Sequence, residues 1–373
     1  MTGNRKKNAA RERCSIRDLA EYVGLSTCTV SKVLNGRTGT KIPEATRERV
    51  FAAARELDYV PNVNAQRLFR RRAGVIGLLV PSQLDAEDHV FTDLHFVDIL
   101  AGMEEMLQGS GSNLLLLFGE KRDANCRYWP LFRAGTVDGL LVWGEHREAG
   151  YLGELLENRA PALFITSVPD SAAPGQLSFV TASYRRTAAE LTGVLCARNP
   201  RRLLFLCGPG GHSVVEAIRA GVEDALAGTG VECTALVSRY ARESARETLL
   251  GALRREKFDG LIVMSRSMES GVQDALRELE IAPEQLPMVL LDGDRRTGLA
   301  AGVLGAARLD DREIGRLAIQ GIRQLIDRET ECFRREVRPE LLIAGGGRSR
   351  YGKTVDFRIL HLKKQANDNI FNK

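Results

Sequence analysis

The sequence predicts an α/β protein, with a small all-α module at the N-terminus followed by a larger, two-lobed core of doubly wound parallel sheets. Three observations lead to this prediction. Apolar stripes at helical spacing occupy about the first sixty residues, and short apolar runs alternate with helical stretches in the rest. Residues 1–72 carry a net charge of +9, whereas the remainder carries −4. A single uniform globule would not divide its charge in this way.

The composition excludes several classes of protein. At 373 residues, 44% of them hydrophobic and 27% charged, the chain is globular in composition and has room for two to three domains. No run approaches ~20 consecutive apolar residues, and the polar start lacks the apolar segment of a signal peptide. The seven cysteines and five histidines are scattered, without metal-ligand spacing. We therefore expect no membrane contact, no metal, no cofactor and a cytoplasmic location.

The basic end contains two short helices joined by a glycine turn. The first carries one apolar stripe, formed by Ile16, Leu19, Ala20 and Val23. Ser15 and Asp18 fit a capping box at its start, Gly24 breaks it, and Ser26 can cap the second helix. Two short helices with a tight turn form a helix-turn-helix, whose second helix can enter the major groove of DNA. An ordinary helical hairpin is the alternative interpretation, and a solvated tail is the alternative for the charge.

A third helix is expected within residues 42–62, and it favours a compact DNA-binding headpiece. Its inward side chains are Val50, Ala53, Ala54 and Leu57. Its outward side chains include Arg47, Arg49 and Arg55. Three helices around a small apolar core are sufficient for such a module.

The motifs D-L-A-E-Y-V-G-L-S, T-V-S-K-V-L-N-G, T-R-E-R-V and E-L-D-Y-V-P-N resemble the lac-repressor (LacI/GalR) family of transcription regulators. The resemblance spans about fifty-five residues, with one short insertion around residues 37–41. It implies that Thr27, Cys28 and Lys32 read bases. It also implies phosphate contacts by Ser15, Ser26, Thr29, Ser31, Asn35 and Tyr59. These side chains suit the roles, since small hydroxyls can hold the backbone and lysine can donate to guanine.

Residues 61–72 occupy the place of the family's hinge helix, which orders on operator DNA. The resemblance implies that Leu68 is wedged into the minor groove, with Ala65 as its small neighbour. It implies that Asn62 and Gln66 face phosphates. A basic linker that happens to contain a leucine is the alternative.

Eight apolar runs in the body predict two similar lobes of parallel sheet. They are residues 74–82, 112–119, 137–144 and 161–167, then 201–208, 233–239, 258–265 and 287–293. Helical stretches lie between them, such as 96–108, 214–226 and 270–279. Ligands of such folds bind where strand carboxyl ends converge, which is the cleft between the lobes. The fragments V-I-G-L-L-V-P, V-D-G-L-L-V, F-D-G-L-I-V and R-E-I-G-R-L-A resemble the family's core, which is similar to periplasmic sugar-binding proteins.

The predicted organisation has five parts. They are a disordered basic leader (1–14), the headpiece (15–60), the hinge helix (61–72), the core (73–347) and a basic extension (348–373). Within the core we expect lobe 1 to hold about 73–167 and 307–332, and lobe 2 about 168–306 and 333–347. The extension could be a disordered tail, a strand added to lobe 2, or an extra contact surface.

The resemblance implies an effector site in the cleft, but this chain departs from the family there. Thr166, Ile218 and the pair Ser265-Arg266 stand where relatives commonly have an Asp, an Arg and Asn-Asp, whereas Asp292 is retained. We also assign Ser82 and Arg219 to this site. Loss of charged groups disfavours a polyhydroxylated ligand. If they face the cleft, the two arginines favour an anionic effector; alternatively the pocket has decayed and Arg266 is a surface or inter-lobe ion-pair residue.

Enzyme interpretations are weak, and we expect no catalytic residues. The segment 208–213 (GPGGHS) is neither a dinucleotide fingerprint nor a Walker A motif, and plain loop geometry explains it. Residues 297–307 are small and apolar, which suggests packing between lobes or subunits. Trp129 and Trp143 are expected in the core or the cleft wall.

The preferred hypothesis is a homodimeric, sequence-specific DNA-binding transcription regulator, a repressor, that binds a near-palindromic double-stranded operator. A small-molecule effector in the cleft would modulate it. The alternative is a cytoplasmic small-molecule binding protein or enzyme whose basic arm is incidental.

Overall fold

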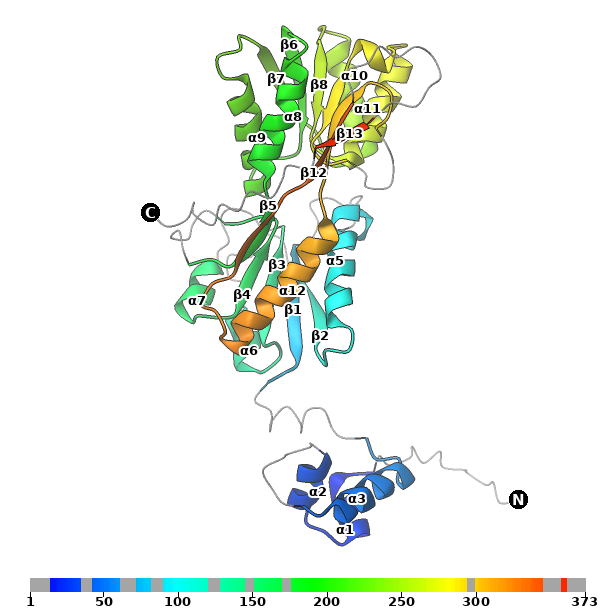
Figure 1. Ribbon diagram of the computed structural model, residues 1–373, viewed down its shortest axis with the longest axis vertical. Coiled ribbons are helices and arrows are strands. Elements are labelled where there is room, and N and C mark those ends of the chain that lie inside the picture. Colours follow the sequence, from blue (N-terminus) through cyan, green and yellow to red (C-terminus); the bar gives the residue numbers. More distant parts are fainter. Residues whose placement is uncertain are drawn as a thin grey trace, which may run out of the picture. The chain divides into compact units, whose positions relative to one another are not determined.

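A computed structural model of the chain describes residues 14–34, 42–60, 72–81, 90–119, 128–144, 151–169, 176–293, 299–344 and 357–360. These residues belong to two compact units, which divide between Gly74 and Val75 (Figure 1). The smaller unit is all-α and the larger is α/β, which confirms the predicted fold class.

The described residues of the smaller unit form three helices around an apolar core. They are α1 (Ile16–Val23), α2 (Thr27–Leu34) and α3 (Glu44–Glu56). The side chains buried between them are Leu19, Ala20, Val23, Val30, Val33, Val50 and Ala53. The Tyr22 hydroxyl donates to Glu56 at 2.8 Å and so ties α1 to α3. The apolar stripes identified in the sequence are therefore the faces that these helices bury.

Helix α1 begins and ends as its sequence predicts. The Ser15 hydroxyl accepts from the Asp18 amide at 3.3 Å, and the Asp18 carboxylate accepts from the Ser15 amide at 2.8 Å, which completes the capping box. Gly24 has φ 63°, a left-handed conformation that lets the chain turn sharply into α2. The Ser26 hydroxyl then accepts from the Thr29 amide at 3.1 Å and caps α2.

The larger unit contains two sheets, each forming one lobe. The sheet of lobe 1 is entirely parallel, in the order β11-β5-β4-β3-β1-β2. Its strands are β1 (Val75–Pro81), β2 (Asn113–Gly119), β3 (Gly139–Trp143), β4 (Ala162–Ile165), β5 (Phe179–Ala182) and β11 (Arg334–Val337). The sheet of lobe 2 has the order β13-β12-β10-β9-β8-β6-β7 and is parallel except for β12 and β13. Its strands are β6 (Arg202–Cys207), β7 (Glu232–Val237), β8 (Gly260–Val263), β9 (Met288–Leu290), β10 (Val303–Arg308), β12 (Glu340–Ala344) and β13 (Phe357–Leu360).

Helices cover both faces of each sheet, as expected for doubly wound lobes. Lobe 1 contains α5 (Leu94–Leu107), α6 (Trp129–Arg133), α7 (Leu152–Glu157) and α12 (Asp311–Asp327), with a 3₁₀ turn at Val90–Thr92. Lobe 2 contains α8 (Tyr184–Cys196), α9 (Ser213–Leu226), α10 (Arg242–Leu253) and α11 (Arg266–Glu278), with a 3₁₀ turn at Pro283–Gln285. Successive side chains of a strand lie on opposite faces of the sheet: Leu78 packs with residues of α5 and α12, whereas Leu79 packs with residues of α6 and α7.

The strand pairing moves the lobe boundaries away from those we expected. Strands β5 and β11 belong to the sheet of lobe 1, although we expected residues 168–306 and 333–347 in lobe 2. Residues 307 and 308 end β10 in lobe 2, although we placed them in lobe 1. The chain therefore passes between the lobes near residues 183, 309–310 and 338–339. Short strands such as β11, which is only half-buried, lack the apolar run that would show them in a sequence.

The small-residue segment 297–307 was interpreted wrongly. Its described part contains β10, which lies inside the lobe 2 sheet between β9 and β12. Gly305 shows why the residues are small, since a β-carbon there would press on the side chain of Leu191 in α8. The segment is therefore a strand under a closely packed helix. The VDFRIL run of the extension contributes β13, which pairs with β12, as in the added-strand alternative.

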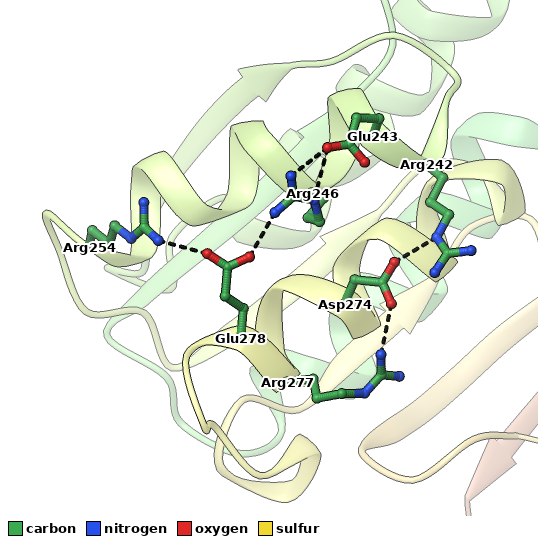
Figure 2. A network of polar contacts seen from close by, with 7 residues as sticks. All are labelled: Arg242, Glu243, Arg246, Arg254, Asp274, Arg277 and Glu278. Carbon is green, nitrogen blue, oxygen red and sulfur yellow. Dashed lines mark hydrogen bonds and ion pairs between the residues drawn. The ribbon is translucent and has the colours of Figure 1, made fainter.

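An ion-pair network joins α10 to α11 on the surface of lobe 2 (Figure 2). Its members are Arg242, Glu243, Arg246, Arg254, Asp274, Arg277 and Glu278. Asp274 accepts from Arg242 at 2.6 Å and from Arg277 at 3.0 Å, and Glu278 accepts from two further arginines. The side chains of Arg242 and Arg277 are 65% and 76% exposed, so each pair contributes little stability by itself.

Candidate functional site

The outer side of α2 carries the residues predicted to read bases. Thr27 and Cys28 are exposed, and Lys32 is half-buried. Val30 and Val33, on the other side of the helix, are 0% and 2% exposed and fill the headpiece core. Helix α2 therefore presents a polar, cationic face that is fixed to a rigid apolar base, as a helix that docks in a groove requires.

The phosphate-contacting candidates lie around the same helix. The described ones are Ser15, Ser26, Thr29, Ser31 and Tyr59. Ser15 and Ser26 are exposed and stand at the first turns of α1 and α2, where helix amides can bind anions. Tyr59 is half-buried against the headpiece core, and burial together with the nearby Cys14 raises the pKa of its phenol. Its hydroxyl therefore remains a hydrogen-bond donor at neutral pH.

The remaining predicted DNA contacts lie outside the described residues. They are Asn35, Asn62, Ala65, Gln66 and Leu68. Their assignment remains a prediction from the sequence, and so does the hinge helix over residues 61–72.

A cavity of about 560 Å³ is lined by residues from both lobes of the core. Thr166 and Thr181 contribute from the strand ends of lobe 1, and Ser213 contributes from the first turn of α9 in lobe 2. Ser183 also lines it, is 7% exposed, and makes no capping hydrogen bond to α8. Cavities of this size hold small molecules, and a hydroxyl that lines the cavity without capping its helix can hydrogen-bond to one.

Thr166 lies in this cavity, where we expected an effector contact. Its φ is 64°, a conformation that a β-branched residue rarely adopts and that clusters at binding and active sites. Its hydroxyl donates to the Ile165 carbonyl at 2.7 Å, and its own carbonyl accepts from Thr181 at 2.8 Å. The turn after β4 is therefore held rigidly by its neighbours.

Two serines connect the lobes beside the cavity. Ser167, which follows β4, and Ser213 of α9 have hydroxyls 3.2 Å apart. The Val168 amide of lobe 1 donates to the Ser213 hydroxyl at 2.8 Å. This neutral contact closes one part of the cleft.

Arg266, another predicted effector residue, lies in a buried ion cluster between the lobes. Its guanidinium donates to Asp311 of α12 at 3.0 Å and lies 3.5 Å from the carboxylate of Asp292. The second oxygen of Asp311 lies 2.7 Å from Nδ1 of His95 in α5. The side chains of Asp311 and Arg266 are 1% and 11% exposed. Arg266 is thus an inter-lobe ion-pair residue, which was the alternative to its role in binding an anion.

The cluster fixes the protonation of its members. Burial by itself would lower the pKa of His95, but the charge and hydrogen bond of Asp311, with Asp93 and Asp292, raise it to about 9. Burial raises the pKa of Asp292 to about 6, although Arg266 and His95 oppose this shift. At neutral pH the two cations therefore face the carboxylates of Asp311 and Asp292, and the cluster offers no surplus positive charge to an anion.

The other predicted effector residues are spread over several places. Ser265 caps α11 through its hydroxyl, next to the ion cluster. Ile218 is 4% exposed and belongs to the apolar core of lobe 2. Arg219 is half-buried and donates to the thiol of Cys207 at 3.0 Å. Ser82 lies outside the described residues. Of the six predicted residues that the structure describes, Thr166 alone lines the cavity described above.

Sequence reasoning missed His95 and Asp311. His95 was set aside because the histidines showed no metal-ligand spacing, and Asp311 follows an Asp that already caps α12. The doubled acid at a helix start was the available signal, since a helix needs only one capping side chain. Their contact joins residues 216 positions apart, which no local pattern indicates.

The unfolding free energy of the core should fall as the pH rises from 6.5 to about 9. His95 holds its proton more tightly in the folded chain, so its contribution is complete below pH 6.5 and lost as the pH passes 9. A shift of this size corresponds to about 3 kcal/mol. Urea unfolding followed by tryptophan fluorescence measures it, because both tryptophans lie in lobe 1.

The matched control for this pH dependence is His95→Gln. Subtracting its pH profile removes the titration of cysteines and other groups that both chains share. A variant whose stability fell as steeply as that of the wild type over this range would contradict the assignment.

The part of the chain that the structure describes has no group of His, Cys, Asp and Glu side chains placed to hold a metal ion. A helix long and apolar enough to span a bilayer was not found in it either.

Comparison with known proteins places both units in one family. Residues 15–62 match the family described as "Bacterial regulatory proteins, lacI family". Residues 73–253 match "Periplasmic binding proteins and sugar binding domain of LacI family". The two matches cover the headpiece and a large part of the core in the order that the sequence predicts.

Individual relatives agree with these matches. The sucrose operon repressor of Klebsiella pneumoniae is 32% identical over 59% of this chain and 63% of its own length. The maltose regulon regulatory protein MalI of Escherichia coli (strain K12) is 31% identical over 57% of this chain and 59% of its own length. The chain thus spans less than two thirds of either relative.

Solved structures share the fold. The lac repressor dimer bound to operator and the anti-inducer ONPF has a TM-score of 0.74 at 20% identity, covering 88% of this chain and 98% of that one. A lacI family regulator from Silicibacter pomeroyi has a TM-score of 0.65 at 25% identity, and the match covers 88% of this chain and 98% of that one. The family consists of regulatory proteins and not of enzymes. The chain belongs to the lacI family of bacterial regulatory proteins.

Proposed function

We propose that the protein is a sequence-specific DNA-binding transcription repressor that acts in the cytoplasm. The observation that carries the proposal is the polar face of α2, in which Thr27, Cys28 and Lys32 stand on a headpiece built around buried Val30 and Val33. Relatives named as repressors, and a structural neighbour bound to operator, support it. The net charge of +9 over residues 1–72 supplies the attraction to phosphates that every such protein needs.

We propose that the repressor is a homodimer. Lobe 1 carries a group of large exposed apolar side chains around α5 and the edge strand β2, namely Phe91, Leu94, Val97, Leu115 and Phe118. An apolar patch on an edge strand requires cover, and a second copy of the chain supplies it symmetrically. A dimer would place two headpieces on the halves of a near-palindromic operator.

Replacing Lys32 by alanine should weaken binding to the preferred duplex by about 1–3 kcal/mol, the value of one good base contact. Binding to mixed-sequence DNA should change much less, because phosphate contacts dominate it. Titrations of both DNAs at one salt concentration make the comparison. The control is Lys257→Ala, which removes an exposed lysine from lobe 2. Equal losses on the two DNAs would show that Lys32 contacts phosphate only.

We propose a small polar effector for the cavity lined by Thr166, Thr181, Ser183 and Ser213. The two arginines that line it are already paired. Arg185 donates to both carboxylate oxygens of Asp224, at 2.7 and 2.9 Å, and Arg186 donates to Glu190 at 2.7 Å. This pairing, together with the neutral cluster at Arg266, weakens the expectation of an anionic ligand. Hydroxyls and the amides of two helix starts suit a neutral polar compound equally well.

A thermal-shift screen of sugars, sugar phosphates and organic acids tests the effector proposal. A ligand of this cavity at 100 times its dissociation constant should stabilise the core by about 2.7 kcal/mol. Ser183→Ala should reduce that shift, whereas Ser270→Ala, at an exposed position on α11, should leave it unchanged. Equal shifts in both variants would place the ligand elsewhere.

A further inference from the structure

We propose that Arg266 and Asp311 form a built-in latch that holds the two lobes closed when no ligand is bound. The inference rests on the proposed function only in assigning the cleft between the lobes to an effector. It concerns how opening of that cleft is regulated. It depends on the contact between the first residue of α11 in lobe 2 and the first residue of α12 in lobe 1.

The position of the two residues makes their contact sensitive to the angle between the lobes. Asp311 is the first residue of α12 and follows directly on the passage of the chain into lobe 1. Arg266 is the first residue of α11 and follows β8 in lobe 2. Rotation of one lobe against the other would lengthen the 3.0 Å contact between them.

The Asp311 carboxylate is prepared for this contact from within lobe 1. His95 binds one of its oxygens at 2.7 Å, and the start of the 17-residue helix α12 favours a negative charge there. Because only 1% of its side chain is exposed, the Asp311 carboxylate is hardly hydrated, and protein groups must stabilise its charge. Lobe 1 therefore presents a buried anion with one oxygen left for a partner, and Arg266 fills that place.

Arg266 is in turn oriented from within lobe 2. Its Nε lies 3.5 Å from the carboxylate of Asp292, which follows β9. Both ends of the bridge are thus held by a residue of their own lobe, so little side-chain entropy is lost when the bridge forms. An ion pair whose remaining groups are satisfied can offset its desolvation cost.

A latch of this kind changes which state of the lobes a ligand must favour in order to act. Two-lobed binding proteins usually close around a ligand that bridges the lobes. A ligand shifts such an equilibrium only by its differential affinity for the open and closed states. If the chain itself supplies the bridge, the closed state is populated without ligand. An effective ligand is then one that binds the open state more tightly, so that Arg266 and Asp311 separate.

Amide hydrogen exchange of the full chain, without DNA or ligand, tests the latch. The Val168 amide is the reporter, because its N–H donates to Ser213 of the other lobe. Arg266→Met should let the lobes open and speed exchange at Val168 by about tenfold or more. The control is Arg277→Met, which removes an exposed arginine from the same helix and should leave the exchange unchanged.

Circular dichroism first establishes that each variant is folded. If the Arg266→Met variant is not folded, Arg266→Gln is used instead, because glutamine keeps a polar group at this position. It should show the same faster exchange. Exchange at Val168 that is as slow in the folded Arg266 variant as in the wild type would overturn the latch. Because no DNA is present, this outcome is independent of whether the chain recognises an operator.

Discussion

Replacing Val30 by aspartate is expected to abolish sequence-specific DNA binding while leaving the core folded. Val30 is 0% exposed at the centre of the headpiece, whose core contains few other side chains. A carboxylate buried there without a partner costs several kcal/mol, more than so small a module can lose. The loss of specific affinity should be about 10³-fold or more, the usual ratio of specific to non-specific binding.

Mobility-shift titration on the preferred duplex measures this loss, and the fluorescence of Trp129 and Trp143 reports on the core. The core should unfold at the wild-type urea concentration, because the headpiece and the core are separate compact units. Ala52→Asp adds the same charge at an exposed position of α3 and should cost only a few-fold in affinity. Specific binding by a Val30→Asp chain would show that the headpiece is not the DNA-binding module.

Asp311→Asn should lower the unfolding free energy of the core by about 3–5 kcal/mol at neutral pH. The substitution keeps the shape of the side chain but removes the charge that faces both His95 and Arg266. Arg266 would then keep only the carboxylate of Asp292 close to it, and the buried His95 would lose the main group that raises its pKa. Breaking a buried ion pair in this way is strongly destabilising. Urea unfolding followed by tryptophan fluorescence measures the change.

Asp274→Asn is the matched control for this substitution. Asp274 also binds two arginines, Arg242 and Arg277, but does so at the surface of lobe 2 (Figure 2). Exposed pairs of this kind contribute less than about 1 kcal/mol. If the two variants were destabilised equally, the buried cluster would be no more important for folding than the surface network.

Local signals made the headpiece predictable in detail. The stripe from Ile16 to Val23, the Ser15–Asp18 capping box and Gly24 are all read from residues close in sequence, and each has the predicted structure. The apolar strands of the core were predictable for the same reason, since a buried parallel strand is a continuous apolar run. The start of helix α11 was predicted less well from local signals. The helix begins at Arg266, four residues before the expected start at residue 270, because Ser265 caps it.

The lobe boundaries and the ion cluster were not predictable, because both depend on contacts between distant segments. Strand β11 has only half-buried or exposed residues, and its place beside β5 is fixed by pairing and not by composition. Arg266 gave two opposite interpretations from the sequence, an anion contact or an ion-pair residue. Only the positions of His95 and Asp311, which come from other elements, distinguish between them.

Selection of bound duplexes from a random DNA pool by the purified chain tests the central claim most directly. A homodimer that reads DNA through α2 should recover a near-palindromic motif at moderate salt, with two half-sites related by two-fold symmetry. Affinity for the recovered motif should fall steeply as salt rises, as phosphate contacts require. Recovery of no motif, with weak binding that is indifferent to sequence, would contradict the proposal that this protein is a sequence-specific repressor.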